Sequence, residues 1–458
     1  MPLNDLTAIS PIDGRYSNKT SPLREYFSEF ALMKYRLMVE IEWFIFLSLE
    51  KSITNLPSLN NSEQKRLRTL YQEFSVKESR KIKTIEKRTN HDVKAIEYFI
   101  KDQLSNYKKL DKYSEFVHFA CTSEDINNLA YSLMIADASE EILLKEIDIT
   151  NNKLKRLSKK YATSPMVSRT HGQIASPTTM GKELANFVYR IGEIQRTIKT
   201  IKLKGKINGA VGNFNAHKIA YPRANWQKIS ERFIKSLGLS HNPYTTQIEP
   251  KDTLVELLNH YQRLSNVLID LSRDIWGYIS LNYFSQTLKK GEVGSSTMPH
   301  KVNPIDFENA EGNLNISKGI FFALSDSIQI SRWQRDLSDS TSMRNVGVGF
   351  SHILIALKSL QNGLDKLKLN QNILKIDLDN SLEVLTEAIQ TIIRKNLIPG
   401  GYELMKDLSR GKKINKLDLH QLIDEINVPS EEKQRLKDLD PSSYIGIADI
   451  LAKQLKDS

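Results

Sequence analysis

The sequence contains one cysteine, Cys121, among its 458 residues. One cysteine cannot form an intrachain disulfide, and it cannot supply a cysteine-rich zinc or iron–sulfur site. The nine histidines are scattered and include no H-E-x-x-H pair, the pattern that most often indicates a zinc site. We therefore expect no metal, no other cofactor and no disulfide, and a reducing cytosol fits this composition.

Long apolar runs are also absent. The best candidate, Trp43 to Leu49, is much shorter than the ~18 residues that span a bilayer, and it follows Glu40 and Glu42, so it predicts a buried helix. Residues 1–10 lack a basic stretch followed by an apolar one, so we expect no signal peptide. Hydrophobic residues make up 40% of the chain and charged residues 26%, which is typical of a globular protein. We expect a cytoplasmic location and no membrane partner.

Two patterns of nucleotide-binding folds are missing, because neither G-x-G-x-x-G nor a Walker A sequence occurs. The G-x-S-x-G elbow of many hydrolases is missing as well, since Ser295 lies in the sequence Val293-Gly294-Ser295-Ser296. The formal net charge of +11 leaves two interpretations, a nucleic-acid binder or an enzyme for an anionic substrate. The basic residues are spread along the chain without interleaved aromatics, so most of them indicate solvated helix faces.

Helical patterns dominate what is present. From Thr253 to about Phe284, apolar residues recur at spacings of three and four, which predicts one helix roughly 40 Å long. This apolar seam consists of Leu254, Leu257, Tyr261, Leu264, Leu268, Leu271, Ile275 and Tyr278. Shorter patterns occupy residues 132–161, 182–202, 307–330 and 346–367. One chain rarely covers so long a seam on all sides, so we predict an all-α fold with an extended helix bundle, and an oligomer.

Helix length and breaker residues divide the chain into three predicted domains. A mostly helical N-terminal domain covers residues 1–112, and a central domain of long helices covers residues 113–367. A small helical C-terminal domain covers residues 368–458, where the helices become short. Pro and Gly interrupt this last part at Pro399, Gly400, Gly401, Pro429 and Pro441.

The most informative polar segment is GEVGSSTMPHKVNP, residues 291–304. Asn303 suits a helix N-cap and Pro304 the first helical turn, and a helix start presents unpaired N–H groups that attract anions. Lys301 lies beside them. Such a loop could hold a carboxylate and stabilise extra negative charge on it, although its composition also fits an ordinary surface loop before a capped helix.

Four other segments concentrate polar chemistry. Two of them, CTSED at residues 121–125 and TNHD at 89–92, are also plausible capping sequences. In the third, RTHGQ at residues 169–173, a lone histidine also fits a structural or merely exposed position. The fourth, RWQRDLSDSTSMRN at 332–345, sets three arginines among hydroxyl groups. Forked guanidinium donors match two oxygens of a carboxylate or phosphate at once. None of these segments is decisive singly.

The loop GSSTMPHKVNP at residues 294–304 closely resembles the signature of the fumarase/aspartase superfamily. The segments around Thr122-Ser123 and Thr170-His171 resemble the other two motifs of that superfamily, in the same order. Further segments are similar to the adenylosuccinate lyase family within it, and the resemblance covers essentially the whole chain. They occupy residues 10–30, 89–100, 168–186 and 335–345. One position differs: this chain has Ile174 where many relatives have a proline after the HGQ triplet. The residue is not one of those expected to take part in catalysis.

This resemblance implies a β-elimination that breaks a C–N bond. The family releases fumarate from adenylosuccinate to leave AMP, and from the succinylated imidazole-carboxamide ribotide SAICAR to leave AICAR. A serine in a dry, anion-stabilising loop can remove the proton next to a carboxylate, and a histidine can protonate the departing nitrogen. We therefore expect Ser295 to be the general base and His171 the general acid.

The resemblance also implies the substrate ligands and the assembly. By motif match the ligands are Arg15, Tyr16, Asn90, His91, Asp92, Thr122, Ser123, Gln247, Lys301, Val302, Asn303, Asn309, Arg335, Ser340 and Arg344. Relatives are homotetramers whose long helices build a central bundle and whose active sites are shared between subunits. Two alternatives stay open: a basic nucleic-acid-binding scaffold, and another superfamily lyase such as argininosuccinate lyase or fumarase.

Overall fold

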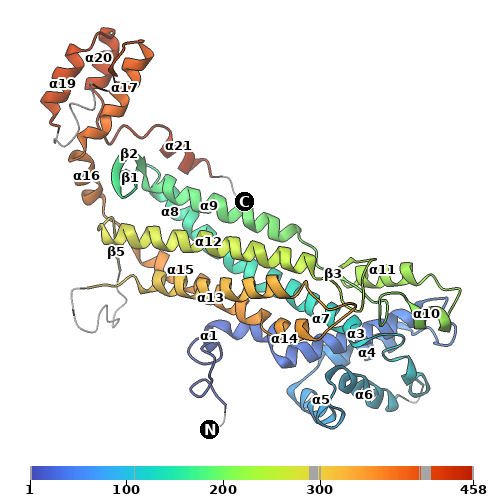
Figure 1. The fold of residues 1–458 in the computed structure, drawn as a ribbon. Coiled ribbons are helices and arrows are strands. Elements are labelled where there is room, and N and C mark those ends of the chain that lie inside the picture. Colours follow the sequence, from blue (N-terminus) through green and yellow to red (C-terminus); the bar gives the residue numbers. More distant parts are fainter. Residues whose placement is uncertain are drawn as a thin grey trace. The chain divides into compact units, whose positions relative to one another are not determined.

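The structure, a computed structural model, describes residues 3–107, 109–287, 298, 301–401, 403 and 414–455 (Figure 1). The chain forms two compact units. Unit 1 comprises residues 1–146, 194–266 and 312–358, and unit 2 comprises residues 147–193, 267–311 and 359–458. Each unit is assembled from three separate stretches of sequence, whereas the three predicted domains are continuous. The domain boundaries at residues 112 and 367 stay a prediction.

Long helices carry the fold, and the prediction of an all-α architecture is confirmed. The predicted 253–284 seam is helix α12, Asp252–Ser280, and its apolar residues from Leu254 to Ile275 are buried. Four more long helices match the other predicted patterns and, like α12, have residues in both units. They are α8 (Leu144–Lys160), α9 (Met180–Thr200), α13 (Ile305–Ser327) and α15 (Val346–Lys366). None of the described helices is apolar and long enough to cross a membrane.

Unit 1 adds a set of mostly short helices to parts of those five. Its helices are α1 (Ser17–Thr20), η1 (Ser21–Leu23), α2 (Arg24–Phe27), α3 (Glu29–Leu49), α4 (Asn61–Gln72), α5 (Val76–Thr89), α6 (Asp92–Ser105), η2 (Asp111–Phe116), α7 (Ser123–Ala138), η3 (Ser139–Leu143), α10 (Asn215–Ala220), α11 (Trp226–Ser236) and α14 (Ser338–Met343). Strands β3 (Lys204–Gly205) and β4 (Ser240–His241) pair in parallel. The apolar run from Trp43 to Leu49 lies within α3, as predicted, and most of it is buried.

Aromatic rings fill part of the unit 1 core. The Phe350 ring lies 5.0 Å from the rings of Tyr261 and Phe321 and 5.5 Å from that of Phe27, measured between ring centroids. A Cβ atom on Gly349 would lie 2.3 Å from Cε1 of Phe321. Glycine at this position therefore lets α15 approach α13 closely enough for the rings to pack.

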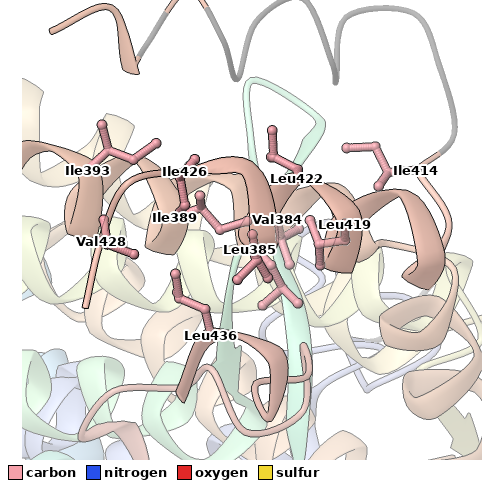
Figure 2. Packing of buried hydrophobic residues seen from close by; sticks show 11 residues of the cluster. Val384, Leu385, Ile389, Ile393, Ile414, Leu419, Leu422, Ile426, Val428 and Leu436 are labelled. Atoms are coloured by element: carbon pink, nitrogen blue, oxygen red, sulfur yellow. The ribbon is translucent and has the colours of Figure 1, made fainter. Parts of the chain in front are cut away.

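Unit 2 contains two antiparallel strand pairs and the C-terminal helices. The pairs are β1 (Pro165–Thr170) with β2 (Gln173–Thr179), and β5 (Phe284–Gln286) with β6 (Leu367–Leu369). The helices are α16 (Gln371–Asp379), η4 (Leu382–Leu385), α17 (Thr386–Lys395), α19 (Lys416–Glu425), α20 (Ser430–Lys437) and α21 (Ala448–Lys453). Figure 2 shows buried side chains of η4, α17, α19 and α20 pointing toward one another, so these short helices share a small core of their own.

Candidate active site

Helix α7 begins at Ser123 with Thr122 as its N-cap, which confirms the capping sequence predicted at residues 121–125. The Thr122 amide donates to Oδ2 of Asp125 at 2.8 Å, which closes a capping box. The Asp125 carboxylate also accepts from the amides of Asn208 and Gly209 and pairs with the Lys206 ammonium at 3.0 Å, and both ionic side chains are fully buried. The start of α7 carries two predicted ligands. The buried Asp125 carboxylate, whose oxygens are hydrogen-bonded and ion-paired, therefore fixes its position.

The turn before Thr122 is strained and clamped. His118 and Ala120 both have positive φ angles, 60° and 58°, which are unfavourable for residues with a side chain. His118 Nδ1 lies 2.6 Å from Oε1 of the buried Glu40, and Trp43 Nε1 donates to the Phe119 carbonyl at 3.3 Å. Burial acts to lower the pKa of His118, but the Glu40 charge and hydrogen bond outweigh it and raise the pKa above its ordinary value. The ion pair with α3 thus holds the turn in its strained form.

Arg335 and Gln247, predicted ligands far apart in sequence, lie together beside the start of α7. Arg335 Nη1 donates to Oε1 of Gln247 at 3.4 Å and lies 3.3 Å from Oε2 of Glu124. The Thr246 hydroxyl also donates to the Gln334 carbonyl at 2.9 Å. Ser340 lines the same small pocket as Glu124. The Arg335 guanidinium therefore contacts both Gln247 and the start of α7, two parts of the chain far from it in sequence.

The Asn90-His91-Asp92 segment lies near the predicted ligand Arg344. Asp92 pairs with Arg36 at 2.9 Å and with Arg344 at 3.4 Å. Burial acts to raise the pKa of Asp92, but these arginines hold it below its ordinary value. His91 is the N-cap of α6 and its Nδ1 accepts from the Lys94 amide at 3.1 Å, so the neutral ring keeps its proton on Nε2.

Arg15 and Tyr16 precede α1. The Arg15 guanidinium lies 5.9 Å from the centroid of the Tyr16 ring, within cation–π range. The Arg15 side chain is exposed and Tyr16 is half-buried. These two predicted ligands therefore stay accessible from solvent.

His171, the predicted general acid, occupies the tip of the β1–β2 hairpin, a turn that was not predicted from the sequence. The two-residue turn is His171-Gly172, with φ angles of 53° and 75°, a pattern that matches a type I′ turn. Arg169 pairs with Asp377 of α16 at 2.8 Å, and the Ser176 hydroxyl donates to Glu387 of α17. The imidazole is exposed on an arm held at both strands, which suits a group that must reach a substrate.

The loop 291–304 is described only in part. The predicted base Ser295 lies outside the described residues. Lys301 is exposed, the Val302 carbonyl accepts from Gln286 Nε2 at 3.3 Å, and the Asn309 Oδ1 accepts from Ser359 at 2.7 Å. Helix α13 begins at Ile305, one residue later than predicted, because the first carbonyl to accept helical amides is that of Pro304. Pro304 therefore takes the cap position expected of Asn303, a difference within the usual uncertainty of helix boundaries.

Three buried charged residues next to these ligands were not predicted from the sequence. Glu124 was expected only to favour the start of α7, and Lys251 and Asp339 gave no signal. The Lys251 Nζ donates to Asp339 Oδ2 at 2.7 Å and lies 3.9 Å from Oε1 of Glu124. In sequence these three residues look like ordinary charged residues of a solvated surface. Only their burial in the fold distinguishes them from such residues. Within the described part of the chain, no group of three His, Cys, Asp or Glu side chains could hold a metal ion.

His217 packs behind the start of α7 and gives a testable acid sensitivity. Its ring is fully buried between Phe214 and Trp226, and burial lowers its pKa to about 4, with Asp125 opposing and Lys206 reinforcing the shift. A lowered folded-state pKa means that the unfolded chain binds the proton first, so stability is full above about pH 6.5 and falls toward pH 4. Between pH 7 and 5 we expect this histidine to remove about 2 kcal/mol of unfolding free energy.

Urea unfolding of the wild type and of His217→Leu at these two pH values checks this expectation. The variant should lose about 2 kcal/mol less than the wild type between the two conditions. An equal loss in both proteins would mean that other groups cause the acid sensitivity.

Comparison with known proteins gives the family. The family described as Lyase matches residues 14–316, and the family described as Adenylosuccinate lyase C-terminal matches residues 331–445. The chain is 52% identical over 456 residues to an adenylosuccinate lyase of Buchnera aphidicola subsp. Schizaphis graminum, covering 100% of both. It is 49% identical to that of Haemophilus influenzae, with 99% of this chain and 100% of the relative covered. The relative from Escherichia coli K12 is 48% identical, with coverage of 100% for both chains.

Two solved structures share the fold at low identity. A fumarate lyase from Mesorhizobium sp. BNC1 superposes with a TM-score of 0.74 at 18% identity, covering 94% of this chain and 96% of that one. A 3-carboxy-cis,cis-muconate lactonizing enzyme from Pseudomonas putida gives 0.71 at 18% identity, covering 94% and 95%. The sequence relatives, the two matched families and this fold agree: the chain belongs to the adenylosuccinate lyase family of the fumarase/aspartase superfamily, and it is a carbon–nitrogen lyase.

Proposed function

We propose that the chain eliminates fumarate from adenylosuccinate to give AMP, and from SAICAR to give AICAR. The observation that carries the proposal is the identity of about half of all residues, over the full length, with several adenylosuccinate lyases. The arrangement of unit 1 supports it, because the predicted ligands Arg335 and Gln247 contact each other, and Glu124 links Arg335 to the pocket that Ser340 lines. Such a substrate carries both phosphate and carboxylate groups, and forked guanidinium donors match them.

Ser295 acts as general base and His171 as general acid in this proposal. The exposed imidazole of His171, at the tip of a braced hairpin, supports its role as a donor that meets the departing nitrogen. Lys301 and the start of α13 supply positive charge that would favour an ionised serine and hold the carboxylate as it gains charge. The remaining predicted ligands bind the nucleotide and succinyl groups.

The assembly belongs to the same proposal: a homotetramer with active sites shared between subunits. Large apolar side chains exposed on the long helices support it, among them Phe322 at 66%, Tyr189 at 63% and Ile316 at 53% exposure. Surfaces of this kind are typical of contacts between subunits. A cytoplasmic location and the lack of nucleic-acid or membrane partners complete the proposal.

A substrate comparison tests the function. Purified protein is given adenylosuccinate, argininosuccinate or malate, and product formation is followed by absorbance. We expect turnover of adenylosuccinate alone, and the same protein should then cleave SAICAR. Turnover of argininosuccinate or malate in its place would assign the chain to another branch of the superfamily. Tight, salt-sensitive retention on DNA without any turnover would favour a nucleic-acid scaffold instead.

Mixing two inactive variants tests the shared sites. Ser295→Ala and His171→Ala subunits are unfolded together, refolded as mixed oligomers and assayed with adenylosuccinate. If the two residues of one site come from different subunits, some sites in the mixture contain both native groups, so activity should return. Each variant refolded alone serves as the control. A mixture as inactive as its parents would place both residues of a site on one subunit.

A further inference from the structure

A buried cluster of four charged side chains lies beneath the predicted ligands of unit 1. It consists of Glu124, Lys251, Arg335 and Asp339, whose side chains are 5%, 8%, 14% and 4% exposed. The formal charges of these four side chains balance, with two cations and two carboxylates. The buried carboxylate of Glu249, which is 4% exposed, lies against them and accepts from the Lys251 amide. Two of its members are next to proposed ligands in sequence, since Glu124 follows Ser123 and Asp339 precedes Ser340. A third member, Arg335, is itself a proposed ligand.

Lys251 is the one member outside these motifs, and it contacts both carboxylates. Its Nζ donates to Asp339 Oδ2 at 2.7 Å and to the Glu249 carbonyl at 3.5 Å, and it lies 3.9 Å from Glu124 Oε1. Asp339 Oδ1 is buried and has no hydrogen-bond partner among the described residues. The Asp339 charge is therefore balanced mainly by Lys251.

The backbone at Lys251 is built to place this side chain. Its φ angle is +66°, in the left-handed region that few side chains favour, and its amide donates to Glu249 Oε2 at 2.7 Å. Lys251 directly precedes α12, so its position is set by the longest helix of the chain. A lysine on the surface would not require this strained φ angle. The strain therefore indicates that the position of the buried ammonium group is functionally important.

We propose that Lys251 is a positioning residue for substrate binding, which through Glu124 and Asp339 holds Arg335 and Ser340 in place for the substrate phosphate. This inference rests on the proposed function. Lys251 itself lies under the ligands and acts through its two carboxylates. Without its charge the four side chains change from a net charge of 0 to −1, and Glu249 adds a further buried carboxylate. Glu124 then draws the Arg335 guanidinium inward, and the carboxylates repel the incoming phosphate.

The effect of losing Lys251 depends on pH. Burial raises the pKa of Glu124, and the charges of Lys251, Arg335 and Lys206 oppose this while Asp339 adds to it. Removing Lys251 deletes the largest opposing charge, so Glu124 takes up a proton more easily. At lower pH this proton restores the wild-type net charge of the buried side chains, Glu249 included, whereas at higher pH the excess negative charge remains. A residue with a merely structural role would not produce this trend.

The test compares kcat and KM for adenylosuccinate in the wild type and Lys251→Met. We expect KM to rise about tenfold with kcat within about threefold, because positioning of a phosphate ligand affects ground and transition states alike. The ratio of variant to wild-type KM should increase from about pH 6.5 to about pH 8.5. Lys251→Arg keeps the charge and should recover most of the wild-type KM. Lys235→Met removes an exposed lysine paired with Glu231 and should leave KM unchanged.

A charge-restoring double variant separates positioning from folding. Lys251→Met with Asp339→Asn restores the wild-type net charge of the cluster, so its KM should fall back to within about threefold of that of Asp339→Asn alone. Lys251→Gln makes the same charge change with a polar side chain and replaces Lys251→Met if that variant does not fold.

Two outcomes overturn the inference. One is a wild-type KM in both neutral variants of Lys251, and the other is a raised KM that is independent of pH and not rescued by Asp339→Asn. Wild-type turnover is measured first: its absence refutes the proposed function, whereas wild-type turnover with either outcome refutes the role of Lys251 alone.

Discussion

Replacing Ser295 with alanine is expected to lower kcat for adenylosuccinate at least about a thousandfold, with binding nearly unchanged. The proton to be removed lies next to a carboxylate and is only weakly acidic, so elimination needs a base that is ionised and in contact with it. Alanine offers no oxygen for this step. Binding depends on other groups, among them Arg335, Gln247 and Lys301, which the substitution leaves in place.

Single-turnover kinetics and calorimetric titration measure the two quantities separately. Ser296→Ala is the matched control, since it removes the neighbouring hydroxyl and should keep most of the activity. If Ser295→Ala turns over at a rate near that of the wild type, serine is not the base. If instead the substrate no longer binds, the hydroxyl serves binding and the chemical role has to be assigned elsewhere.

Replacing His171 is expected to lower kcat by about 10²–10⁴-fold, the usual contribution of a positioned general acid. The leaving nitrogen must gain a proton as the C–N bond breaks, and imidazole titrates close to neutral pH. Asparagine is a better replacement than alanine here, because His171 has a φ of 53° and asparagine tolerates that region well. His171→Asn thus removes the acid while the turn keeps its shape.

Steady-state kinetics of His171→Asn and His171→Ala, with circular dichroism and melting curves, check this expectation. Both should be folded and both slow, and the difference between their melting temperatures should reflect the strain of alanine in the turn. His91→Asn is the informative comparison, because His91 is the next candidate for the acid. Wild-type activity in the His171 variants together with a large loss in the His91 variant would transfer the role.

The sequence predicts those parts of the fold that depend on local pattern. The seam of α12 repeats over its whole length, and burial of Leu264, Leu268 and Leu271 follows from that repeat. A helix cap at Thr122 or Ser123 is predicted because hydroxyl and acidic side chains in that order satisfy the free amides of a helix start, and the structure has it at Thr122. The superfamily is predicted because the loop at residues 294–304 is long and unusual in composition, and because the two other motifs occur in the expected order.

Features that depend on distant contacts are not predictable in this way. The β1–β2 hairpin has few apolar alternations, and its strands are braced by Asp377 and Glu387, about 200 residues further along the chain. The role of Lys251 follows from burial against Glu124 and Asp339, and no spacing rule links the three. A lysine that precedes an aspartate at a helix start is an ordinary surface sequence until the fold encloses it.

The segments of the two compact units alternate along the sequence, and this has a consequence for biosynthesis. Unit 1 uses residues up to 358 and unit 2 already begins at residue 147, so neither corresponds to a continuous piece of chain. On the ribosome, the first unit cannot be completed until its third segment has emerged, and by then two of the three segments of the second unit are waiting for the C-terminal residues. Nascent chains of this enzyme should therefore depend on chaperones for longer than those of proteins whose domains follow one another in sequence.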